Sequence, residues 1–253
     1  MKKKTPTTYF VPALEKALDV VEYLSRKTEP LPLSVIAKDL GRTSSELFRI
    51  MDYLVQRNYV IKESNLNSYT LSLKFFELTF NIPLVRRIVD TASPFLNRLS
   101  SEIGYSSHVS VIEGGDLVII HEQESIWPVY IHVKIGARIP ATATSSGCLL
   151  LGLMSDRDRR NCLDLDKAFL KRNMEEQNRI LQEIRKSSEQ EVYISPSKQH
   201  ERVLDIVAPI ELFHGKYAAL AVPISSASKD SISAVKAKVS LAAAQIQRNL
   251  LGE

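Results

Sequence analysis

The chain has 253 residues, which suits one small and one medium domain or a single large one. Its 44% hydrophobic and 25% charged residues are typical of a globular protein, and no stretch approaches the roughly 18 consecutive apolar residues of a membrane span. The net charge of +4 is a weak indication of a nucleic-acid partner, with most of the excess in residues 1–80. We therefore expect no membrane partner.

The N-terminus and the cysteines bear on the compartment. The charged start at residues 1–4 is followed by Thr5-Pro6-Thr7-Thr8 instead of an apolar run, so we expect no secretion signal. The two cysteines, Cys148 and Cys162, each lie in an apolar-leaning segment. We therefore expect no disulfide framework and a cytoplasmic protein in a reducing environment.

Three short helices are predicted in the first 56 residues, because apolar residues recur there at the spacing of one helix face. The first begins after Pro12, the second is stopped by Gly41, and Thr43 or Ser44 can cap the third. The three apolar faces are Leu14, Ala17, Leu18 and Val21; Leu33, Ile36, Ala37 and Leu40; and Leu47, Ile50, Met51 and Leu54.

Two β-prone runs, residues 59–61 and 69–71, follow the third helix and bracket a polar tip at residues 64–67. Three helices and then a hairpin form the order of a winged helix-turn-helix, with the hairpin as the wing. Residues 73–80 predict a linking helix that is cut off by Pro83, and we place the domain boundary near there.

The rest of the chain has the pattern of an α+β domain, in which helices pack on an antiparallel sheet. A long helix is expected over residues 85–103, which Pro94 would kink or divide. The charged stretch 156–160 separates two further helices. The other expected elements are strands 107–112, 117–122, 129–134, 203–210 and 217–224, and helices 142–154, 175–190 and about 229–250.

The third helix has an outward face that suits DNA. When its apolar face packs inward, Ser45, Arg49, Asp52 and Gln56 point outward, with Phe48 at the edge. Hydroxyls and amides at the helix start can meet phosphates, Arg49 can bind a phosphate or a guanine, and Phe48 can touch a thymine methyl. The candidate DNA-contacting residues are Ser34, Thr43, Ser44, Ser45, Phe48 and Arg49, together with Lys62 and Asn67 on the wing.

Two alternatives remain open for this face. It can be the ordinary solvated face of a three-helix bundle, or the module can be a winged helix that binds proteins and has no DNA affinity. Glu46 and Asp52 are acidic on or near the face and favour these alternatives. Steep salt dependence of nucleic-acid binding would argue against a protein-interaction module, because counterion release requires phosphate contacts.

The sequence resembles the IclR family of bacterial transcription regulators over almost its whole length. In the first half the matching segments are residues 13–21, 33–41, 52–60 and 69–71, together with Ser45 and Arg49. In the second half they are residues 136–143, 207–210 and 218–220, together with Gly215. Their order along the chain is more specific than any one motif.

The resemblance implies a winged helix-turn-helix DNA-binding domain over residues 1–72, a linker helix over 73–84 and a GAF-like effector-binding and oligomerisation domain over 85–253. It also implies homodimers, often paired into dimers of dimers, on partly palindromic double-stranded operator DNA. The apolar side of the first helix and the linker helix with Phe75, Phe76 and Phe80 could serve dimerisation. The phenylalanines could equally belong to a core between the domains.

The second half departs from the family where a small carboxylate would bind. Alignment places the effector-binding candidates at Thr144, Ser145, Ser146, Asp205, Ile206, Ala221 and Pro223. Relative to the family, hydroxyl donors are lost at Ala221 and Pro223 and a carboxylate is gained at Asp205. An anion would be repelled by Asp205 unless Lys198 or Arg202 compensated, so we expect an effector that is neutral, hydroxylated or cationic. The alternative is a register error of one residue, which would turn Asp205 to solvent.

An enzyme is the rival from another class. His108, Glu113, His121, Glu122 and His132 gather in neighbouring predicted strands, but no tight spacing supports a metal site, and His121 and Glu122 point to opposite faces of one strand. Cys148 follows Ser146-Gly147 but sits among leucines, which favours packing over nucleophilic chemistry. The sequence has no Gly-rich phosphate loop, so we expect no cofactor, no metal and no enzymatic activity.

Overall fold

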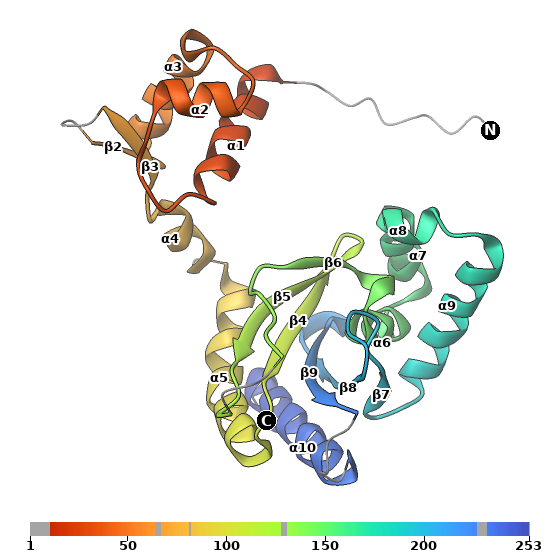
Figure 1. Cartoon of the computed structure of the whole chain (residues 1–253). Coiled ribbons are helices and arrows are strands. Elements are labelled where there is room, and N and C mark those ends of the chain that lie inside the picture. Colours follow the sequence, from red (N-terminus) through yellow and green to blue (C-terminus); the bar gives the residue numbers. More distant parts are fainter. Residues whose placement is uncertain (1–10, 64–66, 81, 128–130, 227–231, 253) are drawn as a thin grey trace. The chain divides into compact units, whose positions relative to one another are not determined.

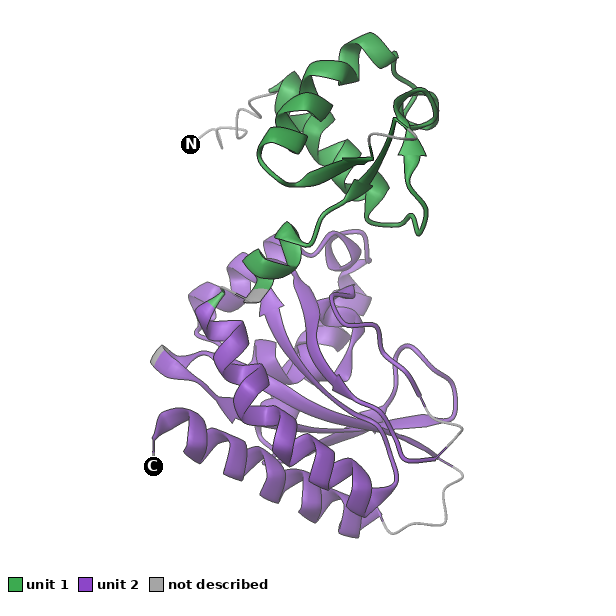
Figure 2. Cartoon of the chain, turned by 90° about the vertical axis from the view of Figure 1, so that its left-hand side faces the viewer, with its two compact units in different colours: residues 1–82 green, residues 83–253 purple. Residues whose placement is uncertain are grey.

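The computed structural model describes residues 11–63, 67–80, 82–127, 131–226 and 232–252. The chain divides into two compact units, residues 1–82 (unit 1) and residues 83–253 (unit 2), shown in Figure 2. Each unit has hydrophobic core clusters of its own, so each is described by itself. The tip of the expected hairpin, at residues 64–66, lies outside the described residues.

Unit 1 has the three helices and the hairpin that the spacing predicts. Its elements are α1 (Pro12–Leu24), β1 (Leu31–Pro32), α2 (Leu33–Asp39), α3 (Ser44–Gln56), β2 (Val60–Glu63), β3 (Ser68–Leu71) and α4 (Lys74–Phe80). The strands form one antiparallel sheet in the order β1-β3-β2. Gly41, between α2 and α3, has a φ of 65°, which a residue with a side chain adopts only at a cost.

The core of unit 1 forms around α3. Leu47 and Met51 are fully buried, as their spacing predicts. In α1, however, the buried residues are Val20 and Leu24, while Leu14 is 56% exposed. The predicted buried face of the first helix is therefore wrong in its N-terminal part. The helix is apolar on two sides, and spacing alone does not tell which side meets α3.

Unit 2 begins with α5 (Pro83–Ile103), which starts on a proline, as helices often do. Pro94 lies inside this helix and does not divide it. Apolar residues on both sides of Pro94, from Ile88 to Leu99, are buried in the main core. Tertiary packing therefore holds the helix together across the backbone hydrogen bond that a proline cannot make.

A six-stranded antiparallel sheet forms the centre of unit 2, in the order β6-β5-β4-β9-β8-β7 (Figure 1). Its strands are β4 (Ser107–Glu113), β5 (Asp116–Gln123), β6 (Arg138–Pro140), β7 (Tyr193–Pro196), β8 (Val203–Glu211) and β9 (Tyr217–Ser225). The helices after α5 are α6 (Ser145–Leu153), α7 (Asp156–Leu165), α8 (Lys167–Leu170), α9 (Met174–Ser188) and α10 (Ile232–Leu251). This is the α+β architecture that the sequence pattern predicts.

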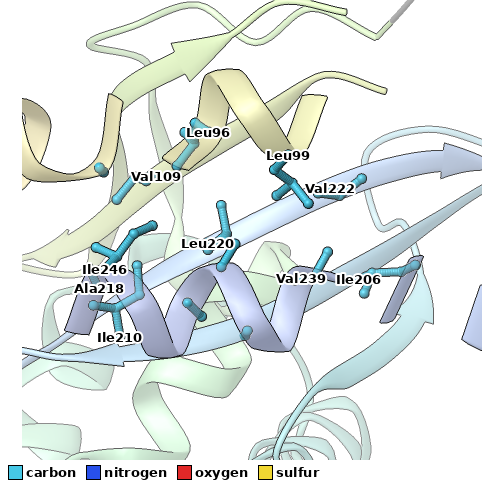
Figure 3. Close-up of a cluster of buried hydrophobic side chains, with 14 of the residues drawn as sticks. Leu96, Leu99, Val109, Ile206, Ile210, Ala218, Leu220, Val222, Val239 and Ile246 are labelled. Carbon is cyan, nitrogen blue, oxygen red and sulfur yellow. The ribbon is translucent and has the colours of Figure 1, made fainter. Parts of the chain in front are cut away.

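The two faces of the sheet carry different layers. On one face, α5 and α10 pack against alternate residues of β8 and β9, such as Ile206, Leu220 and Val222 (Figure 3). On the other face, Leu149 and Leu150 of α6 pack against the intervening residues, among them Val207, Ala219 and Ala221. The alternation along each strand therefore assigns every residue of β8 and β9 to one layer.

Several elements of unit 2 differ from the sequence prediction. Of the strand expected at 129–134, residues 131–134 form no strand, and residues 129 and 130 lie outside the described residues. Besides β4, the strand β5 pairs with the shorter β6. The edge strand β7 was not predicted, because four residues with Ser195 and Pro196 among them give little β signal. The charged stretch at 156–160 lies within α7, which Ser155 caps and which buries only Leu163. With so few apolar residues, α7 lacks the helical repeat of apolar positions from which a helix is predicted.

Candidate functional site

The start of α3 is held by a capping box. Thr43 Oγ1 accepts a hydrogen bond from the Glu46 backbone N–H at 3.3 Å, and the Thr43 N–H donates to Glu46 Oε2 at 2.9 Å. Lys16 Nζ of α1 lies 2.9 Å from Glu46 Oε1. The hydrogen bond from the Thr43 backbone, followed by the contact with Lys16, lowers the pKa of Glu46 to about 2. Glu46, which the sequence marked as an obstacle to DNA, is thus occupied by the helix start and α1.

Beyond this cap, α3 presents an exposed polar face. Ser44, Ser45, Phe48 and Arg49 are all exposed, and the Phe48 side chain keeps 57% of its surface in contact with solvent. Asp52 is exposed on the same helix. The structure therefore brings the predicted reading residues of α3 together on one solvent-facing surface.

The remaining DNA candidates lie on other elements of unit 1. Ser34 is exposed on α2. Lys62 is exposed on β2, with its Nζ 5.7 Å from the centre of the Tyr69 ring. Asn67 is exposed at the start of the returning arm of the hairpin, with a φ of 48°. Thr43 already uses its hydroxyl in the cap, so any contact it made with DNA would compete with the cap.

Two further basic residues of unit 1 lie near the start and the end of α3. Arg57 Nη1 donates to the hydroxyl of Tyr53 at 2.8 Å at the C-terminal end of α3, and both side chains are exposed. The spacing of four residues on one helix could have suggested this pair. Arg42, by contrast, lies 2.8 Å from Asp19 and 3.9 Å from Glu15. Its charge is thus already neutralised within unit 1.

Unit 2 contains a cavity of about 230 Å³ between the start of α6 and the sheet. Six of the seven effector candidates line it. These are Thr144, Ser145, Ser146, Asp205, Ala221 and Pro223. Ile206 does not line it, because it points to the opposite face of β8 and is fully buried against α5 and α10. Its inclusion ignored strand alternation, which places neighbours of Asp205 on the other face.

Other lining residues were not nominated from the sequence. The polar ones are His108, His132, Lys134, Ser197, Gln199 and His200. The apolar ones are Leu117, Ile119, Ile131, Val133, Ala137 and Ile139. Most of these come from β5, β6 and the segments beside them, where the sequence prediction had a strand in the wrong place. A prediction with β6 as the edge strand beside β5 would have placed these residues on the cavity side of the sheet.

Asp205 lies on the cavity face of the sheet. Its register partner is Pro223, and Ile206 pairs with Val222 in the other layer. The hydroxyl of Ser145 donates to Asp205 Oδ2 at 2.7 Å and accepts from Ser195 Oγ at 2.8 Å. Burial raises the pKa of Asp205, although its hydrogen bonds oppose that rise. The alternative of a one-residue register error is therefore wrong.

His108 stands on β4 across the floor of the cavity, paired with the small Ala221. Burial lowers its pKa to about 4, so the imidazole is neutral at neutral pH. A neutral imidazole has one donor and one acceptor nitrogen. His108 can therefore hydrogen-bond a ligand without adding a charge to the cavity.

Lys198 helps to lower the pKa of Asp205 from a distance but forms no ion pair with it among the described residues. Its Nζ lies 2.9 Å from Glu183 Oε2, 3.1 Å from the Thr142 carbonyl oxygen and 3.0 Å from Cys148 Sγ. Arg202 is exposed, and neither basic residue lines the cavity. Cys148 is fully buried and burial raises the pKa of its thiol to about 11, which suits packing and not nucleophilic chemistry.

The residues considered for a metal site separate in the structure. His121 Nε2 lies 3.2 Å from Ser93 Oγ of α5, whereas His108 lines the cavity on the other face of the sheet. His132 Nδ1 lies 2.8 Å from Glu122 Oε2. Within the described ranges, no three His, Cys, Asp or Glu side chains lie together as a metal site requires. No helix in the part of the chain that is described is long and apolar enough to cross a membrane.

Comparison with known proteins matches both halves of the chain to family models. Residues 13–64 match the IclR helix-turn-helix domain. Residues 84–248 match the bacterial transcriptional regulator IclR C-terminal domain. The chain is also 26% identical over 146 residues to the HTH-type transcriptional repressor AllR of Salmonella typhimurium, which covers 58% of this chain and 54% of AllR. It is 23% identical over 154 residues to the HTH-type transcriptional regulator XynR of Escherichia coli, covering 61% of each.

Solved structures share the fold over nearly the whole chain. An IclR homolog from Microbacterium hydrocarbonoxydans, complexed with 4-hydroxybenzoate, superposes with a TM-score of 0.78 at 17% identity, covering 95% of this chain and 100% of that one. The Thermotoga maritima IclR superposes with a TM-score of 0.71 at 18% identity, covering 94% and 98%. The alignments with AllR and XynR span less than two thirds of those relatives, but the C-terminal family model alone spans more than half of this chain. The chain belongs to the IclR family of bacterial transcriptional regulators.

Proposed function

We propose that this protein is a sequence-specific DNA-binding transcription regulator that responds to a small-molecule effector. The observation that carries the DNA-binding half is the exposed face of α3, where Ser44, Ser45, Phe48 and Arg49 lie beyond a capped helix start. Hydroxyls and amides at a helix start suit phosphates, and arginine suits guanine. Lys62 and Asn67 on the wing would contact the DNA backbone or the minor groove.

Selection of bound genomic fragments by the purified protein tests this proposal. Wild-type protein should enrich a partly palindromic site, and Arg49→Ala should weaken binding to that site by about 1–3 kcal/mol. Arg26→Ala is the matched control, because Arg26 is an exposed arginine that follows the end of α1 and is not part of α3. Equal loss in both variants would mean that α3 does not read the site. Failure of wild-type protein to enrich any fragment, alone or with ligand, would favour a protein-interaction module.

The effector would bind in the cavity of unit 2. Its lining combines an apolar wall with a few polar groups, the usual composition of a small-molecule site. The Microbacterium relative was solved with 4-hydroxybenzoate, an aromatic carboxylate. In this chain Asp205 would repel such an anion, so the effector is not a simple small carboxylate. Titration calorimetry with pyruvate and with 4-hydroxybenzoate tests this, and micromolar affinity for either would contradict it.

The functional regions would be the reading domain at residues 1–72, the linker at 73–84 and the effector-binding domain at 85–253. Two reading heads are needed to span successive major grooves, so we expect a homodimer or a dimer of dimers. Leu14 and Leu18 of α1 are 56% and 50% exposed and would lie in the dimer interface. Changing both to Asp should shift the mass measured by light scattering towards the monomer. An unchanged mass would place the interface elsewhere.

A further inference from the structure

The cavity of unit 2 holds a carboxylate that has no cationic partner. Asp205 is half-buried, and the hydroxyl groups of Ser145 and Ser197 are its hydrogen-bond partners. Within the described residues, no lysine, arginine or histidine forms an ion pair with it. A buried carboxylate without a counter-charge is costly, and proteins retain such groups mainly where they serve a purpose.

The nearby basic groups act on Asp205 only from a distance. The charges of His200, which lines the cavity, and of Lys198 help to lower its pKa, but neither forms an ion pair with it in the described part of the chain. Lys198 is paired with Glu183 and does not line the cavity. His108 faces the cavity but is neutral, because burial lowers its pKa to about 4. Lys134 lines the cavity from an exposed position and forms no ion pair with Asp205 in the described part of the chain. No described basic side chain is therefore in direct contact with the Asp205 carboxylate, which leaves that position open to a cationic group of a ligand.

Asp205 also occupies the place where an anionic ligand would be stabilised. Ser145 is the first residue of α6, and the positive end of the helix dipole favours a negative charge at this turn. The carboxylate of Asp205 already accepts the Ser145 hydroxyl there. Beside it, Ala221 and Pro223 form a floor without side-chain donors. The Asp205 carboxylate thus takes the position of an anionic ligand, and a bound ligand has to present a group that attracts a carboxylate.

We propose that the cavity binds a small organic cation, whose protonated amino group pairs with Asp205 and whose apolar body lies against Leu117, Ile119 and Ile139. This ligand class rests on the proposed role of the cavity as the effector site. The ammonium group donates to the carboxylate, and the neutral His108 offers a second hydrogen-bonding position on the neighbouring strands. The apolar residues of β5 and β6 exclude water from the pair and so strengthen it.

Three probes of equal size test the charge preference. Benzylamine, benzyl alcohol and benzoate share one ring and differ in a group that is cationic, neutral or anionic at pH 7.5. Titration calorimetry on the full chain should show benzylamine binding at least tenfold more tightly than benzyl alcohol, with benzoate the weakest. Equal or tighter binding of benzoate would overturn the proposal, and so would the absence of binding by all three at millimolar concentration.

Variants assign the preference to Asp205. Asp205→Asn keeps the shape and should remove the tenfold difference between the amine and the alcohol. If Asp205→Asn does not fold by circular dichroism, Asp205→Ser removes the charge with a smaller side chain and should abolish the same difference. Glu211→Gln removes a carboxylate from the same strand, outside the cavity, and should change nothing. Survival of the amine preference in Asp205→Asn, or its loss in Glu211→Gln, would contradict the assignment.

A DNA-binding assay separates this ligand class from the proposed function. Operator affinity is measured by fluorescence anisotropy with and without saturating benzylamine. Preferential binding of the amine together with an altered operator affinity supports both proposals. Preferential binding without any change of operator affinity leaves the ligand class standing and removes the effector role of the cavity.

Discussion

The two functional helices of this protein start with the same three residues. Thr43-Ser44-Ser45 opens α3, and Thr144-Ser145-Ser146 opens α6. In each helix the threonine is the N-cap and its hydroxyl accepts a backbone N–H three residues later. The serines of α3 are exposed, whereas Ser145 and Ser146 are only 1% and 5% exposed. One helix start faces outward and the other closes a cavity.

The fourth residue explains the difference. In α3 it is Glu46, whose carboxylate accepts the backbone N–H of the N-cap and pairs with Lys16 of α1. The carboxylate at the start of α3 therefore comes from the helix itself. In α6 it is Gly147, whose missing side chain lets the helix approach the Ala141 backbone, and the carboxylate comes from Asp205 on β8. Contacts lower the pKa of Glu46, and burial raises that of Asp205. Under the two proposals, the same three residues would face a polyanion in one place and a cation in the other, because different elements pack against them.

The largest effect is expected from Gly147→Ala. A Cβ at this position would lie 2.0 Å from the Ala141 carbonyl oxygen and 2.7 Å from Thr144 Oγ1. Because backbone cannot move aside cheaply, the free energy of unfolding of unit 2 should fall by about 3 kcal/mol in urea denaturation followed by circular dichroism. Ser146→Ala, in the same turn, should cost less than about 1 kcal/mol. A variant as stable as wild type would mean that α6 does not approach residue 141 so closely.

The two caps should separate stability from DNA binding. Thr43→Ala and Thr144→Ala should each lower the free energy of unfolding by about 1 kcal/mol, because each leaves a helical N–H without its acceptor. Thr43→Ala should also weaken operator binding, since it loosens the reading face, whereas Thr144→Ala should leave the affinity unchanged. Anisotropy with a labelled operator measures this. Equal effects of both changes on operator affinity would contradict the division of roles.

How much could be predicted from the sequence differs between the two regions. In α3 the signals are local. Leu47 and Met51 repeat at helical spacing, and Thr43 was one of the two predicted caps, although the capping box with Glu46, whose spacing is recognisable, was not predicted. Asp205 was also nominated for the cavity, by alignment with the family, and it lines the cavity in the structure. The spacing of residues along the chain could not predict which side chains would hydrogen-bond to Asp205. Ser145 is 60 residues away along the chain and meets Asp205 only when α6 folds onto the sheet.

The errors have the same physical origin. The buried side of α1 was misassigned because its choice between two apolar sides depends on α3. The strand expected at 129–134 was wrong over residues 131–134, which line the cavity wall as irregular backbone, and the short β6 lies beside β5 instead. Ile206 was nominated beside Asp205 although alternation sends it to the other layer. Each error concerns which neighbour a residue packs against, which local spacing does not contain.

A smaller effect is expected from Asp205→Asn in the absence of ligand. Burial raises the pKa of Asp205 in the folded protein. A carboxyl group with a raised pKa in the folded state contributes stability at pH values below its unfolded-state pKa, and this contribution is lost as the pH rises through its folded-state pKa. The charged form of Asp205 therefore destabilises the folded protein at neutral pH. The variant should therefore be more stable by about 1 kcal/mol at pH 7, and the gain should shrink towards pH 4. Urea denaturation at both values measures this, and a less stable variant at pH 7 would show that Asp205 is already compensated within the chain.

The smallest effect concerns Glu46, which is exposed and whose pKa is lowered to about 2. A lowered pKa gives stability that is present above the unfolded value of 4.5 and is lost as the pH falls through about 2, the reverse of Asp205. Carboxyl carbon NMR should follow this titration directly. Lys16→Ala should raise the value only part of the way, because the larger cause, the hydrogen bond from the Thr43 backbone, remains. A return to the ordinary value would mean that the ion pair with α1, and not the capping box, holds the carboxylate at the start of the reading helix.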